Sequence, residues 1–243
     1  MKKLLLKYLH PKYLIYLISY KNLFFGETEL SFLKKFVDPQ RDAIDIGAHR
    51  GIYSFFLTKL AKKVYIHEPN PTLYNFLKKI SFKNAQLSNL ALSDNENVAE
   101  LRIPILNDNL TSSWGTISEK KQLFDNYKSF IVNTTSLDIL NYQNIGFVKI
   151  DVEGHEYKLI EGAINFLKTN KPVLLIEIEQ RHNDINIDKI FNIIVNLGYS
   201  GYFILNNKLL PLSKFSIIIH QNINKRIYIN NFFFVPKNFN RNN

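Results

Sequence analysis

The sequence of 243 residues contains no cysteine, so neither a disulfide framework nor a thiolate metal site is available to it. It also has no internal repeat, no coiled-coil heptad pattern and no proline-rich linker. Charged residues make up 21% and aromatic residues 14% of the chain, which excludes a disordered composition. With 46% hydrophobic residues, the chain is long enough for one well-buried α/β core.

No segment of the sequence has the pattern of a membrane span or of a cleaved signal peptide. Met1–Tyr20 begins with a basic stretch, but Lys7 and Lys12 interrupt its apolar run and no small-residue cleavage site follows. We expect instead an N-terminal helical cap over residues 1–40, and a cytoplasmic location that also fits the lack of cysteine. A basic segment rich in Tyr and Leu is also compatible with peripheral contact at the inner face of an acidic membrane.

Acidic residues are few relative to basic ones: 31 Lys and Arg against 21 Asp and Glu give a net charge of +10. Such a field attracts anionic partners, namely nucleic acid, acidic membrane or phosphorylated glycan. The lysines are scattered rather than arranged in a stripe, and no nucleic-acid recognition motif is present. Nucleic acid is therefore not the expected partner, although a basic nucleic-acid-binding protein without catalysis remains an alternative. Compositional bias explains the charge equally well.

The stretch around which the chain is organised is a short apolar run, Ala43–Ile46, followed by a loop with Gly47 and Gly51 and then by helix-like sequence. This pattern predicts a strand, a cofactor loop and a helix. A G-x-G-x-x-G fingerprint is absent, and Asp45 would repel a phosphate and favour a cationic ligand. The D-x-G-x-x-x-G pattern is typical of S-adenosylmethionine sites. A tight turn without a ligand and an NAD-dependent oxidoreductase are the alternatives.

A second strand, Val64–Ile66, ends at an acid, Glu68, which lies 17 positions after Gly51. Open α/β folds place an acid at about this distance to accept hydrogen bonds from a ribose diol. We predict that Glu68 has this role; a solvated charge at the end of a strand is the alternative.

The stretch after a third apolar strand, Phe147–Ile150, carries Asp151, Glu153 and His155 close together. Ligands bind at the carboxyl ends of strands in open α/β sheets, so these side chains are candidates for a general base. We expect neighbouring carboxylates to raise the pKa of His155 above its usual value. A capping role is the structural alternative. One strand end cannot converge enough ligands on a metal ion, and we predict no metal.

Strands and helices alternate along the rest of the chain, with Leu73–Ile80 and Leu159–Leu167 among the helical stripes. The pattern also predicts a hairpin partner at Val98–Ile103, and an irregular segment at Asn107–Val132 that would recognise the substrate. The further predicted strands are Gln86–Leu92, Val173–Glu179, Tyr202–Leu205 and Asn231–Val235.

Several linked motifs together resemble the FkbM-type methyltransferase family over about Glu27–Val235. They are Asp45–Gly51, His67–Pro71, Asn89–Asp94, Thr134–Asp138 and Lys149–Glu156. The resemblance implies a class I methyltransferase (Rossmann-like) fold over residues 41–243: a mostly parallel seven-stranded sheet, helices on both faces and an antiparallel C-terminal strand. It implies O-methyl transfer from S-adenosylmethionine to a hydroxyl of a sugar, glycan or related natural product, including phosphorylated or lipid-linked acceptors.

The resemblance also implies roles for individual residues. The glycine loop would hold the methionine side of the cofactor, Glu68 the ribose, and Asn89–Asp94 the adenine, while Asp151 would face the sulfonium or the acceptor. His49 stands where many relatives carry Asn. The predicted cofactor-binding set is Asp45, Gly47, Ala48, His49, Gly51, Ser54, Glu68, Asn70, Asn89, Asp94 and Asp151, and the predicted catalytic set is His155, Asp151 and Glu153.

Overall fold

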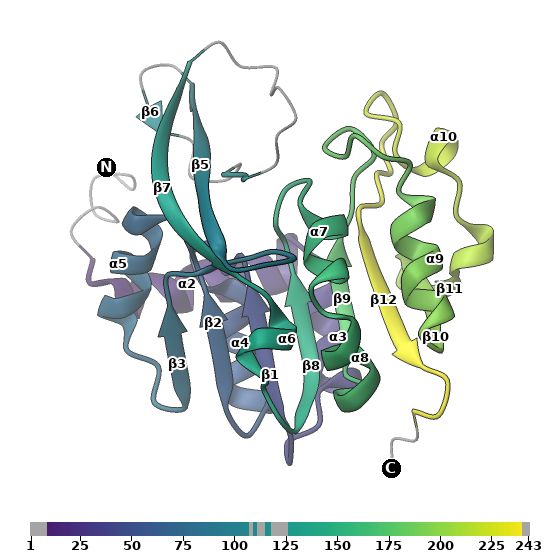
Figure 1. Ribbon diagram of the computed structural model, residues 1–243, viewed down its shortest axis with the longest axis horizontal. Helices are drawn as coiled ribbons and strands as arrows, with labels where there is room; N and C mark the ends of the chain where they lie inside the picture. The colour runs from purple at the N-terminus through teal and green to yellow at the C-terminus, as the bar shows by residue number, and fades with distance from the viewer. Residues whose placement is uncertain (1–8, 107–108, 111–114, 118–125, 240–243) are drawn as a thin grey trace.

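The computed structural model describes residues 9–106, 109–110, 115–117 and 126–239. Within them, eight strands form a central sheet in the order β11-β10-β12-β9-β8-β1-β2-β3 (Figure 1). The strands of this sheet are β1 (Asp42–Ile46), β2 (Val64–His67), β3 (Ala85–Ser88), β8 (Ile145–Ile150), β9 (Val173–Glu177), β10 (Tyr199–Leu205), β11 (Lys208–Pro211) and β12 (Asn231–Pro236).

The five strands β3, β2, β1, β8 and β9 are parallel neighbours, and β12 is antiparallel to both β9 and β10. The predicted α/β class and the antiparallel C-terminal strand are therefore confirmed. The sheet has eight strands rather than seven, because β11 pairs with β10 across a turn at Asn206 and Asn207, both with positive φ. Every residue of β8 is buried, as expected for a central parallel strand.

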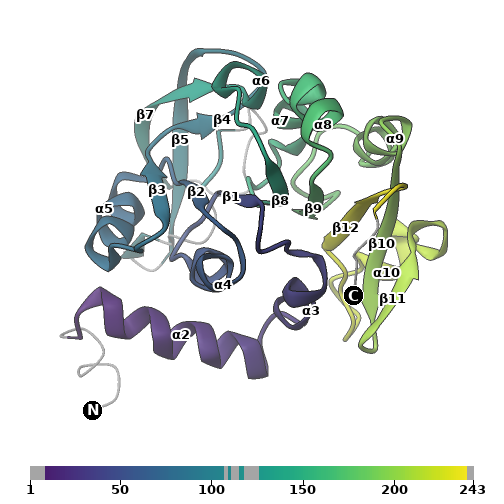
Figure 2. The same cartoon turned by 90° about the horizontal axis from the view of Figure 1, so that it is seen from below.

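Helices cover both faces of the sheet, and each face has its own hydrophobic core cluster. One cluster contains Leu159, Phe166 and Ile190 from the helices on one face; the other contains Leu33 and Leu57 from the opposite face. Helix α2 forms an outer layer against α4 (Figure 2). The helices are α2 (Pro11–Phe25), α3 (Glu29–Phe36), α4 (Ile52–Leu60), α5 (Pro71–Ile80), α6 (Leu137–Leu140), α7 (Glu156–Glu161), α8 (Ile164–Asn170), α9 (Asp188–Asn196) and α10 (Ile217–His220), with a 3-10 turn, η1 (Leu212–Lys214).

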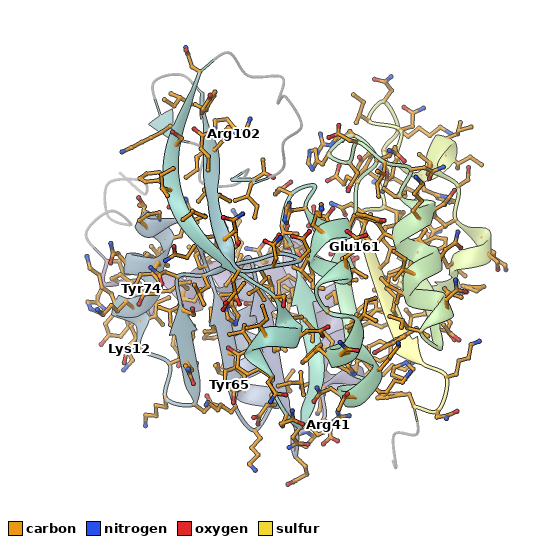
Figure 3. The ribbon with its side chains drawn as sticks, viewed as in Figure 1. Lys12, Arg41, Tyr65, Tyr74, Arg102 and Glu161 are labelled. Carbon is orange, nitrogen blue, oxygen red and sulfur yellow. The ribbon has the colours of Figure 1, made fainter. Side chains whose placement is uncertain are left out.

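At the amino ends of the parallel strands, Arg41 ties β1 to its neighbours (Figure 3). Its guanidinium donates hydrogen bonds to the carbonyl oxygens of Ile145 and Asn170, each at 2.5 Å. Among the described residues, no helix is both long and apolar enough to cross a bilayer.

Two predicted elements are divided in the structure. The run Gln86–Leu92 is not one strand: β3 stays in the central sheet, whereas β4 (Ala91–Leu92) leaves it and pairs with β7. The helical stripe Leu159–Leu167 breaks into α7 and α8 around Gly162. A Cβ at Gly162 would lie 2.2 Å from the carbonyl oxygen of Ser93, so close contact with the chain after β4 decides where α7 ends.

The predicted hairpin partner is found in a second, smaller sheet with the order β4-β7-β5-β6. β5 (Asn97–Leu106) pairs antiparallel with β7 (Tyr127–Thr135), and β6 (Asn109–Leu110) pairs with β5. This pair of long strands stands above the carboxyl edge of the main sheet (Figure 1). The prediction of an irregular segment to Val132 is wrong, because β7 begins at Tyr127. Trp114 and residues 1–8 lie outside the described residues.

Candidate active site

The glycine loop after β1 has the backbone conformation that its sequence suggests. Gly47 has φ +73°, and its N–H donates to the carbonyl oxygen of His67 at 2.9 Å. A Cβ at Gly47 would lie only 1.8 Å from the carbonyl oxygen of Asp151. Glycine therefore allows the loops after β1, β2 and β8 to meet at one point.

A cavity opens at this meeting point, at the carboxyl ends of the central strands. Six of the predicted site residues line it: Gly47, His49, Glu68, Asn70, Asp151 and Glu153. An apolar wall completes it with Leu90, Ala91 and Leu92, and residues Leu101 and Ile117 of the smaller sheet and its connection close it from above. The tertiary structure thus brings together residues that lie more than a hundred positions apart in the sequence.

Glu68 is held in the cavity wall by two backbone groups. Its Oε2 accepts a hydrogen bond from the N–H of His49 at 2.6 Å, and its Oε1 accepts one from the N–H of Asn70 at 2.9 Å. Asn70 in turn caps α5 by accepting from the N–H groups of Thr72 and Leu73. Burial raises the pKa of Glu68 to about 8, although both backbone bonds oppose the shift. Hydrogen bonds donated by a diol would favour the ionised form and lower this pKa, and a carboxylate held by two backbone groups is suited to accept them.

Asp45 is placed away from the cavity wall, behind the loop. It is buried and accepts a hydrogen bond from Ser54 Oγ at 2.5 Å, which ties β1 to α4. Burial raises its pKa to about 6, with the Ser54 bond opposing the shift. Ala48 and Gly51 likewise shape the loop without lining the cavity. The hydrogen-bonded side chains of Asp45 and Ser54 thus support the loop from behind.

The stretch predicted to border the adenine, Asn89–Asp94, lines the main cavity with side chains other than the two predicted to bind. Asn89 is exposed, and Asp94 lies at a neighbouring cavity, where its carboxylate meets the Lys158 ammonium at 2.9 Å. The apolar residues that follow Asn89, from Leu90 to Leu92, line the main cavity instead. The motif Asn89–Asp94 predicts this stretch, but it does not predict which of its side chains line the cavity.

His155 also lies at the neighbouring cavity, where its Nε2 is 2.9 Å from Ser93 Oγ. The expectation that carboxylates raise its pKa is wrong. Burial lowers the pKa to about 4 and outweighs the opposing charge of Asp94. His155 is therefore neutral at physiological pH, but it does not line the cavity that contains Glu68.

A buried lysine that the sequence analysis did not select lies beneath Asp151. Lys149 Nζ is 3.7 Å from Asp151 Oδ2, donates a hydrogen bond to Asn231 Oδ1 at 3.3 Å, and lies 5.0 Å from the centre of the Tyr53 ring. Burial alone would lower its pKa, but Asp151 and Glu177 raise it, so the lysine is charged. In the sequence, the feature that could have identified this residue is a lysine within an otherwise apolar strand.

Glu153 is paired with His182, a second residue that sequence reasoning did not assign to catalysis. The Nδ1 of His182 is 2.9 Å from Glu153 Oε2. Glu153 has φ +50°, and the next residue, Gly154, approaches the carbonyl of His182 so closely that its Cβ would lie 2.3 Å away. Thr116 Oγ1 donates to the carbonyl oxygen of Glu153 at 2.7 Å. The smaller sheet and the loop after β9 thus fix this carboxylate at the cavity.

Two further acidic residues, at the end of β9 and just after it, lie near Asp151 and Glu153 without lining the cavity. Glu177 accepts from Asn230 Nδ2 at 2.6 Å, and Glu179 accepts from Tyr228 OH at 2.6 Å and from Arg181. Burial, with the nearby charge of Asp151, raises the pKa of Glu177 to about 10. No cluster of three or more metal-ligating side chains occurs among the described residues, and metal independence stays a prediction.

A parallel sheet with helices on both faces and a cavity at the carboxyl ends of β1, β2 and β8 defines a class I methyltransferase fold. The family model of the methyltransferase FkbM domain matches residues 45–201. The chain therefore belongs to the FkbM methyltransferase family, as its motifs predicted. A search of curated proteins finds no significant match.

Among solved structures, one methyltransferase of this family has a similar fold. The chain is similar to the methyltransferase FkbM from Methylobacillus flagellatus KT, with 17% identity and a TM-score of 0.54 over 88% of this chain and 47% of that one. It thus spans about half the length of that protein. It also matches an rRNA methylase from Streptococcus thermophilus with 16% identity and a TM-score of 0.47, over 85% and 92% of the two chains. At 17% identity the likeness to the Methylobacillus protein concerns the fold alone.

The Glu68 carboxylate gives a direct test of the cofactor. Glu68→Ala is expected to weaken binding of S-adenosylhomocysteine by about 1.5–3 kcal/mol, the range for hydrogen bonds to a charged group, which is about tenfold to 150-fold in the dissociation constant. Titration calorimetry would measure this change. Asp188→Ala, at an exposed acid of α9, is the matched control.

Two results would count against this role of Glu68. One is an unchanged dissociation constant in a folded Glu68→Ala protein. The other is tighter binding of NAD than of S-adenosylhomocysteine by the unaltered protein. Glu68→Gln should lose less affinity than Glu68→Ala, because its amide oxygen can still accept a hydrogen bond.

Proposed function

We propose that this methyltransferase uses S-adenosylmethionine to methylate a hydroxyl group of a sugar, a glycan or a related natural product. The observation that supports this most strongly is the cavity in which Glu68 and Gly47 face Asp151 and Glu153. Membership in a methyltransferase family favours methyl transfer over the hydride transfer of an NAD-dependent oxidoreductase.

The residues present fit this cofactor. Glu68 would hold the ribose diol, the Gly47 loop would lie against the methionine portion, and Leu90 to Leu92 would cover the adenine. Bound S-adenosylmethionine supplies an electrophilic methyl group on a sulfonium cation. Carboxylates in a cavity favour a cation, and Asp151 provides one there. The buried Lys149 lies beneath it, with its Nζ 3.7 Å from Asp151 Oδ2, and this ion pair would hold the side chain in place.

A third cavity, separate from the one beside His155, favours an acceptor with an apolar part and an anionic group. It lies between α2, α5 and β5, shares Asn70 and Leu73 with the main cavity, and adds Leu14, Phe76 and the cation Arg50. Apolar side chains would accommodate a lipid or another apolar part, and an exposed guanidinium would pair with a phosphate. A phosphorylated or lipid-linked acceptor fits these residues.

The proposal is tested by methyl transfer from labelled S-adenosylmethionine to a panel of glycans, lipid-linked sugars and RNA. We expect label in a hydroxylated acceptor, released as a methyl ether that survives mild base, and turnover that persists in EDTA. Label found only in RNA would contradict the acceptor class. Turnover that is abolished by EDTA and restored by magnesium would contradict the metal-free reaction.

A further inference from the structure

Helix α2 is apolar on two faces, of which only one is covered by the protein. Its inner face packs on α4 and α5 and buries Ile15 and Ser19. Figure 2 shows α2 as the outermost layer on this side of the molecule. A helix that is apolar all round is usually buried on every side. Its outer face therefore requires an explanation.

The outer face is a continuous stripe that runs the length of the helix. Its members recur at helical spacing and are exposed: Lys12, Tyr13, Tyr16, Leu17, Tyr20, Lys21, Phe24 and Phe25. We call these eight residues the α2 stripe. Phe24 and Phe25 are the most exposed of them, at 72% and 87%. Exposed aromatic residues gathered in this way mark an interaction surface.

The charged residues of α2 itself are all positive. Helix α2 contains Lys12 and Lys21 and no acidic residue. Lys59 of α4 adds a further cation: its Nζ lies 5.3 Å from the ring centre of Tyr16 and 5.1 Å from that of Tyr20. Lys12, at the start of the stripe, lies at the outer edge of the molecule (Figure 3). The α2 stripe thus combines aromatic rings with lysines and contains no acidic residue.

We propose that the α2 stripe docks on the surface of an anionic lipid bilayer. Tyr and Phe side chains are suited to the boundary between headgroups and acyl chains, and lysines beside them are attracted to acidic headgroups. Because the inner face of α2 packs on α4 and α5, the stripe would meet the bilayer along its length, with the helix axis in the plane of the surface. The chemistry of the stripe, and not the proposed methyl acceptor, carries this inference.

Vesicle co-sedimentation of the full chain tests the proposal. We expect the protein to sediment with phosphatidylglycerol–phosphatidylcholine vesicles and not with phosphatidylcholine alone, and to be released by high salt. Two double variants, Phe24→Ser with Phe25→Ser and Lys12→Glu with Lys21→Glu, should each lower vesicle affinity at least about tenfold, since one basic residue near such a surface contributes on the order of fivefold.

Matched controls use exposed residues elsewhere on the molecule. Ile218→Ser with Ile223→Ser removes two exposed apolar side chains, and Lys208→Glu with Lys225→Glu reverses two exposed charges, without touching α2. Both controls should bind vesicles as the unaltered protein does. We expect every variant to remain folded, because every substituted side chain is exposed. Thermal unfolding would check this.

Three results would overturn the proposal. The stripe variants could bind anionic vesicles as tightly as the controls, or the unaltered protein could bind neutral and anionic vesicles equally. In the third, the unaltered protein does not bind vesicles but forms a dimer, and the double variant Phe24→Ser with Phe25→Ser is monomeric. Sedimentation velocity would measure this difference. The last result would assign the α2 stripe to a second copy of the chain.

Discussion

Glu153→Gln is expected to lower kcat by about 10²–10⁴-fold, the usual contribution of a general base. The prediction takes His182 as the group that would accept the acceptor's proton, because its partner Glu153 lines the cavity. With Nδ1–H donating to Glu153, the lone pair of His182 Nε2 remains available to accept a proton. A glutamine at position 153 presents an amide N–H to Nδ1 of His182. It therefore favours the His182 tautomer that carries its proton on Nε2, which cannot accept another proton there. His182→Gln should have a similar effect, because it removes the base itself.

The same pair predicts the pH dependence. Burial alone would lower the pKa of His182, but the hydrogen bond and the charge of Glu153 outweigh it and raise the pKa above the usual 6.5. The base must be unprotonated, so kcat should fall as the pH drops through a value above 6.5. Replacing Glu153 by Gln removes the charge that raises this pKa. The acid limb of the residual activity should therefore move to lower pH.

His155→Gln is the matched control for this prediction. His155 bonds Ser93 at the neighbouring cavity, so the variant should keep near-full turnover. Affinity for S-adenosylhomocysteine should change less than about threefold in all three variants, because a base acts on the acceptor. A large loss of kcat in His155→Gln, together with an active Glu153→Gln, would return the catalytic role to His155.

Gly47→Ala is expected to lower the free energy of unfolding by about 2–5 kcal/mol, from the sum of a strained dihedral and overpacking. A Cβ there would lie 1.8 Å from the carbonyl oxygen of Asp151, which belongs to the backbone and cannot rotate away. The loops after β1 and β8 would have to separate, and the cofactor cavity lies between them. Chemical denaturation would measure the stability, and calorimetry the expected loss of S-adenosylhomocysteine binding.

Gly198→Ala separates the cost of the strained backbone dihedral from the cost of overpacking. Gly198 has φ +91°, but its Cβ would meet only the flexible end of Lys171 at 3.5 Å. This variant should lose only the cost of a left-handed backbone, about 1–2 kcal/mol. Equal losses in Gly47→Ala and Gly198→Ala would mean that the close approach to Asp151 contributes nothing to stability.

Much of the site was predictable because local pattern and position in the fold agree. Gly47, Glu68 and Asp151 each follow a short apolar strand, and the carboxyl ends of parallel strands meet at one edge. Periodicity could not place the limits of the smaller sheet. The strand Tyr127–Thr135 pairs with residues about thirty positions earlier in the chain. An alternation of polar and apolar residues of this kind predicts a strand only weakly when the partner strand is not known.

The sequence by itself determined the α/β class, the family and the glycine loop, because these follow from apolar runs and from motifs read along the chain. Only the tertiary structure decided which polar side chains reach the cavity. Asp45 faces Ser54, His155 faces Ser93, and His182 meets Glu153 from the loop after another strand. The physical reason is that the direction of a side chain at a strand end depends on contacts between loops, which are distant in sequence.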